Sequence, residues 1–254
     1  MATTKKVSNP AAALGQEVGK LIEDALVESL RLAMEVYGHT IGPERMKNGT
    51  DNVFQIDAVV RDDKGNPVIL LDPKYIRYKK HNRDKGSWLC VAHYNLRKTY
   101  PSIRKSIAVL AGNWSGTSVD LIKSFGIETL GIPFAHIRKV VADYGIEFDW
   151  DEKDRETPRE SFETYLGLEQ EQKKDIAERL IEPVKKALED SVIDVIQTTI
   201  ADQRIKQIEL LLKTDSDQML LLQYESVAKA LEGMAGFVSD RRDIRVFLEN
   251  GIGD

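Results

Sequence analysis

Two short apolar runs that lie close together constrain the fold of this chain more than any other feature of its sequence. The segments VFQIDAVV (53–60) and PVILLDPKY (67–75) are rich in β-branched and aliphatic residues, which is typical of strands. Between them lies RDDKGN, in which Gly65 and Asn66 supply the backbone freedom that a tight connection requires. The two runs therefore predict a β-hairpin.

Helical and strand-like segments alternate on both sides of this hairpin. Before it, apolar residues recur at three- and four-residue steps from about Ala11 to Tyr37, which indicates an amphipathic helix that Gly38 ends. After it, helices are expected over about 88–100, 118–126 and 136–145, and strands over 106–112 and 127–134. Such interleaving predicts an α/β (α+β) fold with a mixed central β-sheet flanked by helices.

The chain changes character after Asp149, where the charged segment DWDEKDRETPRE precedes long helical patterns. Pro183 is expected to kink or interrupt them. We therefore expect two regions, a core of residues 1–150 and a mainly helical extension of residues 151–254 that dimerises or braces the core. The apolar stripe of the extension falls on Ile176, Leu180, Val184, Ala187 and Leu188 and continues less regularly through Ile193, Ile196, Ile200, Ile208 and Leu212.

The composition excludes several classes of protein. The 254 residues contain neither an apolar run of about eighteen residues nor an apolar stretch of signal-peptide length at the N-terminus, so a cytoplasmic protein without a membrane partner is expected. The single cysteine, Cys90, excludes disulfide scaffolds and zinc ribbons. Neither a Walker lysine loop nor a dinucleotide glycine fingerprint occurs, so no nucleotide cofactor is expected.

Charged side chains interrupt both apolar runs of the hairpin. Asp57 lies in the first run, Asp72 in the second, and Lys74 follows two residues later. Because side chains alternate along a strand, Asp72 and Lys74 project to the same side, and pairing of the strands could bring Asp57 beside Asp72. Two carboxylates suit Mg²⁺, which stabilises charge on a phosphodiester, while the lysine orients or deprotonates the attacking water. The alternative is an ion pair on an edge strand.

The spacing acid-x-Lys is weak by itself, because it recurs at 62–64, 151–153 and 171–173, but only Asp72 and Lys74 lie in an apolar strand. The order of helix, acid-bearing hairpin, helix, strand, helix and strand resembles the PD-(D/E)xK nuclease superfamily over about residues 11–146. The resemblance implies a restriction-endonuclease-like core in which Asp57 and Asp72 bind the metal and Lys74 is the catalytic lysine.

A glutamate of the first helix often joins the metal site in that superfamily. Glu23 is the favoured candidate for a catalytic and metal-binding role, because GKLIEDALVESL resembles the family's Gly-x-x-x-Glu helix opening, with Gly19 four residues ahead. Glu17 and Glu28 remain open alternatives for the same position.

The net charge of −5 conceals an uneven distribution: residues 1–146 carry 21 Lys and Arg against 15 Asp and Glu, and residues 147–254 carry 15 against 26. Residues 74–105, here called the basic segment, hold ten Lys and Arg against one acid, interleaved with aromatic residues. This pattern favours nucleic-acid binding, with a loop of residues 75–87 long enough to enter a groove. The expected DNA-binding residues are Arg77, Lys79, Lys80, His81, Asn82, Arg83, Lys85, Arg97, Lys98, Arg104 and Lys105.

These features together predict a Mg²⁺-dependent endodeoxyribonuclease that cuts double-stranded DNA. The chain resembles type II restriction endonucleases, which implies a homodimer acting on a short palindromic sequence. DNA is then expected against the basic segment, with a few contacts from Arg204, Lys206, Arg241, Arg242 and Arg245 of the extension. The alternatives are a structure-specific repair or junction-resolving nuclease, a non-catalytic DNA-binding subunit of the same fold, and a helical interaction protein with a charged surface.

Overall fold

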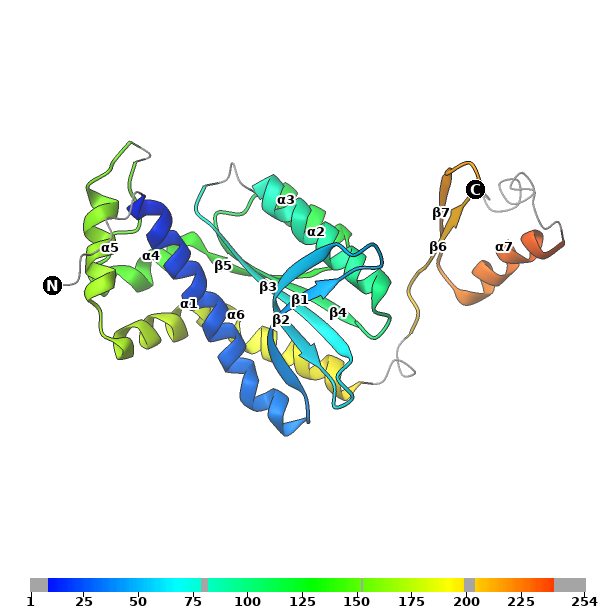
Figure 1. The fold of residues 1–254 in the computed structure, drawn as a ribbon, viewed down its shortest axis with the longest axis horizontal. Coiled ribbons are helices and arrows are strands. Elements are labelled where there is room, and N and C mark those ends of the chain that lie inside the picture. Colours follow the sequence, from blue (N-terminus) through cyan, green and yellow to red (C-terminus); the bar gives the residue numbers. More distant parts are fainter. Residues whose placement is uncertain (1–8, 79–81, 152, 199–203, 240–254) are drawn as a thin grey trace. The chain divides into compact units, whose positions relative to one another are not determined.

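The structure, a computed structural model, describes residues 9–78, 82–151, 153–198 and 204–239 (Figure 1). The chain divides into two compact units, Met1–Gln197 and Thr198–Asp254. The first unit holds the candidate site. None of the helices that the structure describes has both the length and the apolar character needed to span a bilayer.

A five-stranded mixed sheet forms the centre of the first unit, as the sequence predicts (Figure 1). The first three strands in the sheet order form an antiparallel meander, and the last two run parallel to the third. In sequence and sheet order the strands are β1 (Thr40–Lys47), β2 (Val53–Arg61), β3 (Pro67–Ile76), β4 (Lys105–Gly112) and β5 (Glu128–Pro133). The central strands β3 and β4 are almost wholly buried, which explains their continuous apolar runs.

Helices cover both faces of this sheet. One face packs against α1 (Pro10–Val36), α4 (Phe134–Ala142) and α6 (Gln170–Gln197), and α5 (Thr157–Gly167) packs on α1 (Figure 1). The other face packs against α2 (Asn82–Thr99) and α3 (Gly116–Ser124). Asn9 caps the N-terminus of α1 by accepting a hydrogen bond from the amide of Ala12 at 3.1 Å. After the C-terminus of α1, Gly38 adopts the left-handed conformation, at φ +70°, in which the chain leaves the helix.

The sequence pattern did not predict β1. Its sequence TIGPERMK lacks regular alternation and contains Pro43, which has no backbone N–H. An edge strand tolerates proline because the N–H groups on its outer side have no neighbouring strand to bind. The predicted loop of residues 75–87 was also wrong, because β3 extends to Ile76 and α2 begins at Asn82. Residues 79–81 between them lie outside the described residues.

The boundary between the two units differs from the one that the charge pattern predicts near Asp149. Phe148 and Trp150 are buried against the first unit, and the buried stripe of α6 packs on α1, so that unit continues to Gln197. Pro183 lies inside α6 without ending it. The charge change therefore marks the exposed faces of α5 and α6 and not an interruption of packing.

The second unit contains an antiparallel hairpin of β6 (Ile208–Lys213) and β7 (Met219–Tyr224), followed by α7 (Val227–Ser239). Residues 151–254 are mainly helical, with α5, α6 and α7, but the helical stripe expected through Ile208 and Leu212 was wrong, because these two residues share one face of a strand with period two. Arg204 and Lys206 are exposed, whereas Ile200, Arg241, Arg242 and Arg245 lie outside the described residues.

Candidate active site

A β-bulge on β2 places Asp57 next to Asp72. Gly42 pairs with Val59 and Glu44 with Ile56, so Asp57 and Ala58 together lie opposite one residue of β1. Ile56 and Ala58 consequently belong to cores on opposite faces of the sheet, which regular alternation would not allow. The bulge at Asp57 therefore reverses the alternation of side chains between the two faces of the sheet along β2.

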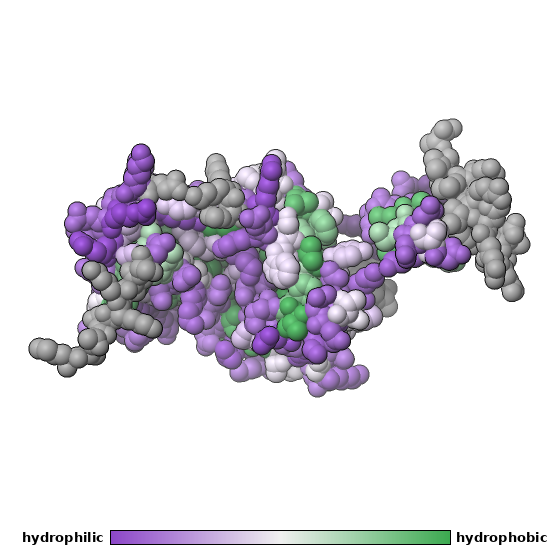
Figure 2. All heavy atoms as spheres, turned by 45° about the horizontal axis from the view of Figure 1, so that its top comes forward, coloured by the Kyte–Doolittle hydropathy of each residue, from purple (hydrophilic) through white to green (hydrophobic). Residues whose placement is uncertain are grey.

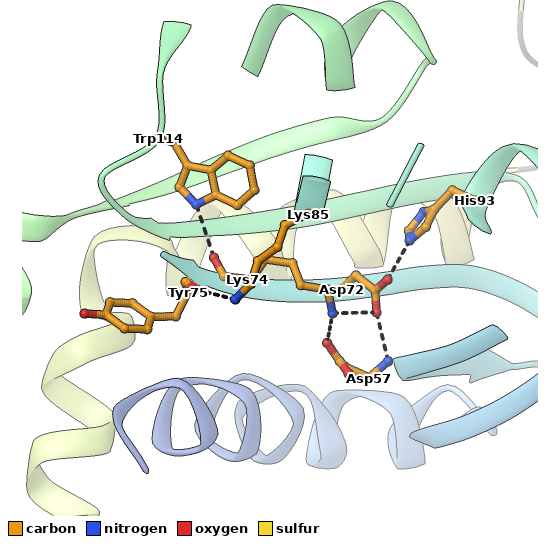
Figure 3. A network of polar contacts seen from close by, with 7 residues as sticks. All are labelled: Asp57, Asp72, Lys74, Tyr75, Lys85, His93 and Trp114. Atoms are coloured by element: carbon orange, nitrogen blue, oxygen red, sulfur yellow. Dashed lines mark hydrogen bonds and ion pairs between the residues drawn. The ribbon is translucent and has the colours of Figure 1, made fainter. Parts of the chain in front are cut away.

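The pairing of β2 with β3 ends beside this bulge, at Ala58 and Leu71. The amide of Asp57, which lies one residue beyond the last pair, donates a hydrogen bond to Oδ1 of Asp72 at 2.9 Å. The Asp72 carboxylate thus replaces a backbone partner. Figure 3 shows the two aspartates side by side where the strands separate.

Lys74 connects the two carboxylates, as its spacing on the strand predicts. Its Nζ donates to Oδ2 of Asp57 and lies 3.6 Å from Oδ1 of Asp72 (Figure 3). The side chains of Lys74 and Asp57 are 23% and 21% exposed, whereas that of Asp72 is 3% exposed. One carboxylate is therefore enclosed, and the other carboxylate and the ammonium group remain open to solvent.

His93 of α2 completes the environment of Asp72 and was missed as a member of this site. Its ring is fully buried, and Nε2 lies 3.1 Å from Oδ2 of Asp72. The signal that could have identified it is its place between Leu89 and Leu96, on the buried side of α2, where an apolar residue is expected.

The electrostatics of the three charged groups follow from these contacts. Burial acts to raise the pKa of Asp72, but the hydrogen bond with His93 and the charge of Lys74 outweigh it and hold that pKa below its usual value. Burial and repulsion by Asp72 raise the pKa of Asp57 despite the attraction of Lys74. Burial acts to lower the pKa of Lys74, but the charges of Asp72 and Asp57 raise it. Lys74 is therefore an ammonium group at neutral pH.

The structure distinguishes the three glutamates considered for α1. Glu23 lines the cleft beside Lys74, and burial followed by repulsion from Asp57 raises its pKa. Glu17 instead accepts a hydrogen bond from the hydroxyl of Tyr165 at 3.1 Å, and Glu28 forms an exposed ion pair with an arginine one turn away. Glu23 is thus the candidate glutamate whose pKa is raised by the charge of Asp57.

The donor set fits a Mg²⁺ site that is shared with solvent. Among the described residues, no three His, Cys, Asp or Glu side chains are grouped so that they could hold a metal ion by themselves. The expected three-carboxylate site that includes Glu23 is therefore not assembled. Asp57 and Asp72 remain, and Mg²⁺ commonly uses one or two carboxylates together with waters and phosphate oxygens.

A cleft of about 670 Å³ adjoins these residues. Its walls come from the first half of α1, the end of β3, and Trp150, Asp154 and Arg155. Its cations are Lys20, Lys74, Arg77, Lys85 and Arg155. The acidic residues of its lining are Glu23 and Asp154, so positive charge predominates. A cleft with this charge favours an anionic ligand.

Two hydrogen bonds fix the end of β3 at the mouth of this cleft. Nζ of Lys85 donates to the carbonyl of Tyr75 at 2.9 Å, and Nε1 of Trp114 donates to the carbonyl of Lys74 at 3.2 Å (Figure 3). Burial and the charge of Lys74 lower the pKa of Lys85. Lys85 therefore lies beside Lys74 at the end of β3, and Lys74 is the lysine that contacts the aspartates.

Much of the basic segment is used inside the fold, contrary to the expectation of one DNA-binding surface. Arg77 donates to the carbonyls of Phe148 and Trp150 at 2.6 and 3.2 Å and covers the Trp150 ring at 3.6 Å. Asn82 is buried and donates to the carbonyl of Asn113 at 3.2 Å, so it is not available to a base edge.

Two cations near the C-terminal end of the basic segment, Arg97 and Lys105, also bind other parts of the fold. Arg97 donates to the carbonyls of Phe125 and, at 3.2 Å, Gly126, which satisfies the end of α3. Lys105 forms an ion pair with Glu128 at 2.7 Å. Arg83 and Lys98 are exposed and Arg104 is half-buried, whereas Lys79, Lys80 and His81 lie outside the described residues.

The exposed side of α2 is apolar and aromatic as well as basic. Trp88 and Tyr94 are 59% and 44% exposed, and their rings lie 5.7 Å from Phe54 and 6.3 Å from Phe125. Figure 2 shows apolar residues gathered in a strip on the surface of the first unit. The basic segment therefore does not form a uniformly charged face.

Comparisons with known proteins assign no family to this chain. No family model matches its sequence, and no curated protein is similar to it. Among solved structures, the chain is similar to the crystal structure of AF1548, a protein of unknown function. The two are 13% identical over 69% of this chain and 98% of the other, with a TM-score of 0.32.

Proposed function

We propose that this protein is a Mg²⁺-dependent endodeoxyribonuclease that hydrolyses phosphodiester bonds in double-stranded DNA, at a short palindromic sequence in the manner of type II restriction endonucleases. One observation carries the proposal: Asp57, Asp72 and Lys74 meet at the point where β2 and β3 separate, beside a cleft in which cations predominate. Carboxylates and an ammonium group beside an anion-attracting cleft favour phosphodiester chemistry.

Asp57 and Asp72 are the residues that would hold Mg²⁺. When bound, the ion lowers the pKa of its water and offsets the negative charge that develops on the phosphate. The raised pKa of Lys74 favours one of the two roles expected for it: as an ammonium group it orients the attacking water and stabilises phosphate charge, and it does not accept the proton.

The cations of the cleft would position the DNA backbone. Lys85 lies beside Lys74, and Lys20 and Arg155 line the same cleft, so phosphates in the cleft would meet positive charge. Contacts of this kind give affinity and register but no choice of base. The polar residues Asn9 and Gln16 also line the cleft and are suited to hydrogen bonding with bases or sugars.

A second candidate is a nuclease specific for branched or frayed DNA. It is favoured by the position of the site beside a bounded cleft and by the division of the basic segment between internal contacts and separate surfaces. A strand that has left the duplex needs less contact area than an uninterrupted helix.

The test is digestion of supercoiled plasmid DNA by the purified protein with MgCl₂ or with EDTA. Asp72→Asn removes a charge from the site, and Asp62→Asn is a matched control because Asp62 and Lys64 have the same acid-x-Lys spacing in the exposed turn. We expect discrete fragments from the wild type and from Asp62→Asn with Mg²⁺, and none from Asp72→Asn, which keeps its DNA binding.

Cleavage of plasmid by Asp72→Asn at the wild-type rate would contradict the site. Cleavage of branched oligonucleotides without cleavage of plasmid favours the second candidate. DNA binding by the wild type without cleavage of either substrate identifies a non-catalytic DNA-binding protein.

A further inference from the structure

The buried contact between His93 and Asp72 points to a further member of the site. We infer that His93 is a positioning residue, which holds the Asp72 carboxylate in the orientation in which Asp57, Lys74 and a divalent cation meet it. The inference rests on the proposed function, because it gives His93 a role within that same site.

The Asp72 carboxylate is held from two directions. Oδ1 accepts a hydrogen bond from the Asp57 amide at 2.9 Å, and Oδ2 lies 3.1 Å from Nε2 of His93 (Figure 3). The first contact comes from β2 and the second from α2, so rotation about the last side-chain bond of Asp72 would break one of them. Loss of His93 would leave Oδ2 buried without this partner, which favours reorientation of the carboxylate.

The chemistry of the two groups gives the direction of this hydrogen bond. A carboxylate oxygen accepts, so Nε2 of His93 donates. Nδ1 of His93 is buried and has no hydrogen-bond partner among the described residues, so the tautomer with its proton on Nε2 leaves no N–H unpaired. Leucines precede and follow this position on α2, and an aliphatic residue would pack there without a polar atom. The bond to Asp72 is therefore what explains a histidine here.

The experiment uses the full chain with three substitutions of His93. His93→Leu removes the donor, His93→Gln keeps an N–H at a reach similar to that of Nε2, and His93→Asn carries an amide too short to reach Asp72. His136→Leu is the control, since Nε2 of His136 contacts the carbonyl of Arg179 at 2.9 Å, outside the site. Two quantities are measured: the MgCl₂ concentration for half-maximal plasmid cleavage, and the increase in Tm that MgCl₂ causes without DNA.

We expect His93→Leu and His93→Asn to raise the half-maximal MgCl₂ concentration by about tenfold or more, as loss of a hydrogen bond to a metal ligand commonly does. The Mg²⁺-induced increase in Tm should decline with it. His93→Gln should restore most of both quantities, whereas His136→Leu should lower Tm without changing the half-maximal concentration. If His93→Leu does not fold, the comparison of Gln with Asn decides.

Wild-type values for both Mg²⁺ quantities in the Leu and Asn variants would overturn the inference and leave His93 a structural residue. Failure of the wild type to cleave any DNA would instead overturn the proposed function. In that case the Mg²⁺-induced change in Tm decides on His93 alone, and its absence from the wild type overturns this inference as well.

Discussion

The end of the β2–β3 hairpin and the basic segment are both rich in charged residues, but the fold brings those of the hairpin together and separates those of the basic segment. Three charged residues of the hairpin meet within hydrogen-bonding or ion-pair distance. The basic segment is divided among a cleft, the end of α3, an ion pair with β5 and the exposed side of α2. Strand residues two apart share a face, whereas a helix of eighteen residues distributes its side chains around the axis and along about 27 Å.

The largest expected difference between the two regions lies in the cleavage rate. Lys74→Ala should lower it by about 10²–10³-fold, because an ammonium group that stabilises charge on the phosphate is lost from the site. Lys105→Ala, at the other end of the basic segment, should leave the rate close to that of the wild type because its partner is Glu128. Single-turnover cleavage of labelled duplex measures both. Equal losses in the two variants would remove the distinction between the regions.

The pH dependence of stability should reveal the buried carboxylate of the hairpin. The pKa of Asp72 is lowered in the folded state, so its stabilisation is present above the ordinary Asp pKa and is lost as pH falls through the folded-state value. At pH 7 Asp72→Asn should lower the free energy of unfolding by about 1–3 kcal/mol, the range for charged hydrogen bonds. Urea unfolding from pH 7 to pH 3 should show this difference shrinking. If the difference in the free energy of unfolding between the wild type and Asp72→Asn stays constant with pH, ionisation of Asp72 does not stabilise the folded state.

Arg97 and Lys98 test whether neighbouring cations of the basic segment have different roles. Arg97→Met should lower the free energy of unfolding by about 1–2 kcal/mol, because the carbonyls at the end of α3 lose their donor. Lys98→Met, at an exposed position, should change stability by less than about 0.5 kcal/mol. Thermal or urea unfolding measures both. Equal stability of the two variants would show that the Arg97 contacts add nothing.

The smallest expected effect separates the two ends of α2 by their contribution to DNA affinity. Lys85→Ala should weaken binding a few-fold and reduce the slope of log affinity against log salt by about 0.9, because one phosphate contact is lost. Lys98→Ala lies about 20 Å further along the same helix, at 1.5 Å per residue, and should leave the slope unchanged. Binding to duplex DNA in EDTA at several salt concentrations measures both slopes. A loss of slope in Lys98→Ala alone would place the DNA at the other end of the helix.

Much of the fold follows from local patterns. The amphipathic period of α1, the hairpin of β2 and β3 and the alternation of later strands and helices were predicted, with bounds within a few residues except at α2, which begins at Asn82 and not near Trp88. The strand β1 was not, because an edge strand that contains Pro43 has little alternation to reveal it. The boundary at Gln197 was also missed, because burial of α5 and α6 on α1 depends on contacts between residues far apart in sequence.

In the candidate site, too, some relations between residues are local in sequence and others depend on the tertiary structure. The sequence by itself placed Asp72 and Lys74 on one side of a strand, because the period of two is a local property of extended backbone. Only the tertiary structure decided that a bulge turns Asp57 toward them, that His93 reaches Asp72 from α2 and that Glu23 lies nearer than the other two glutamates. Those relations depend on strand register and on the packing of helices against the sheet, which no local period encodes.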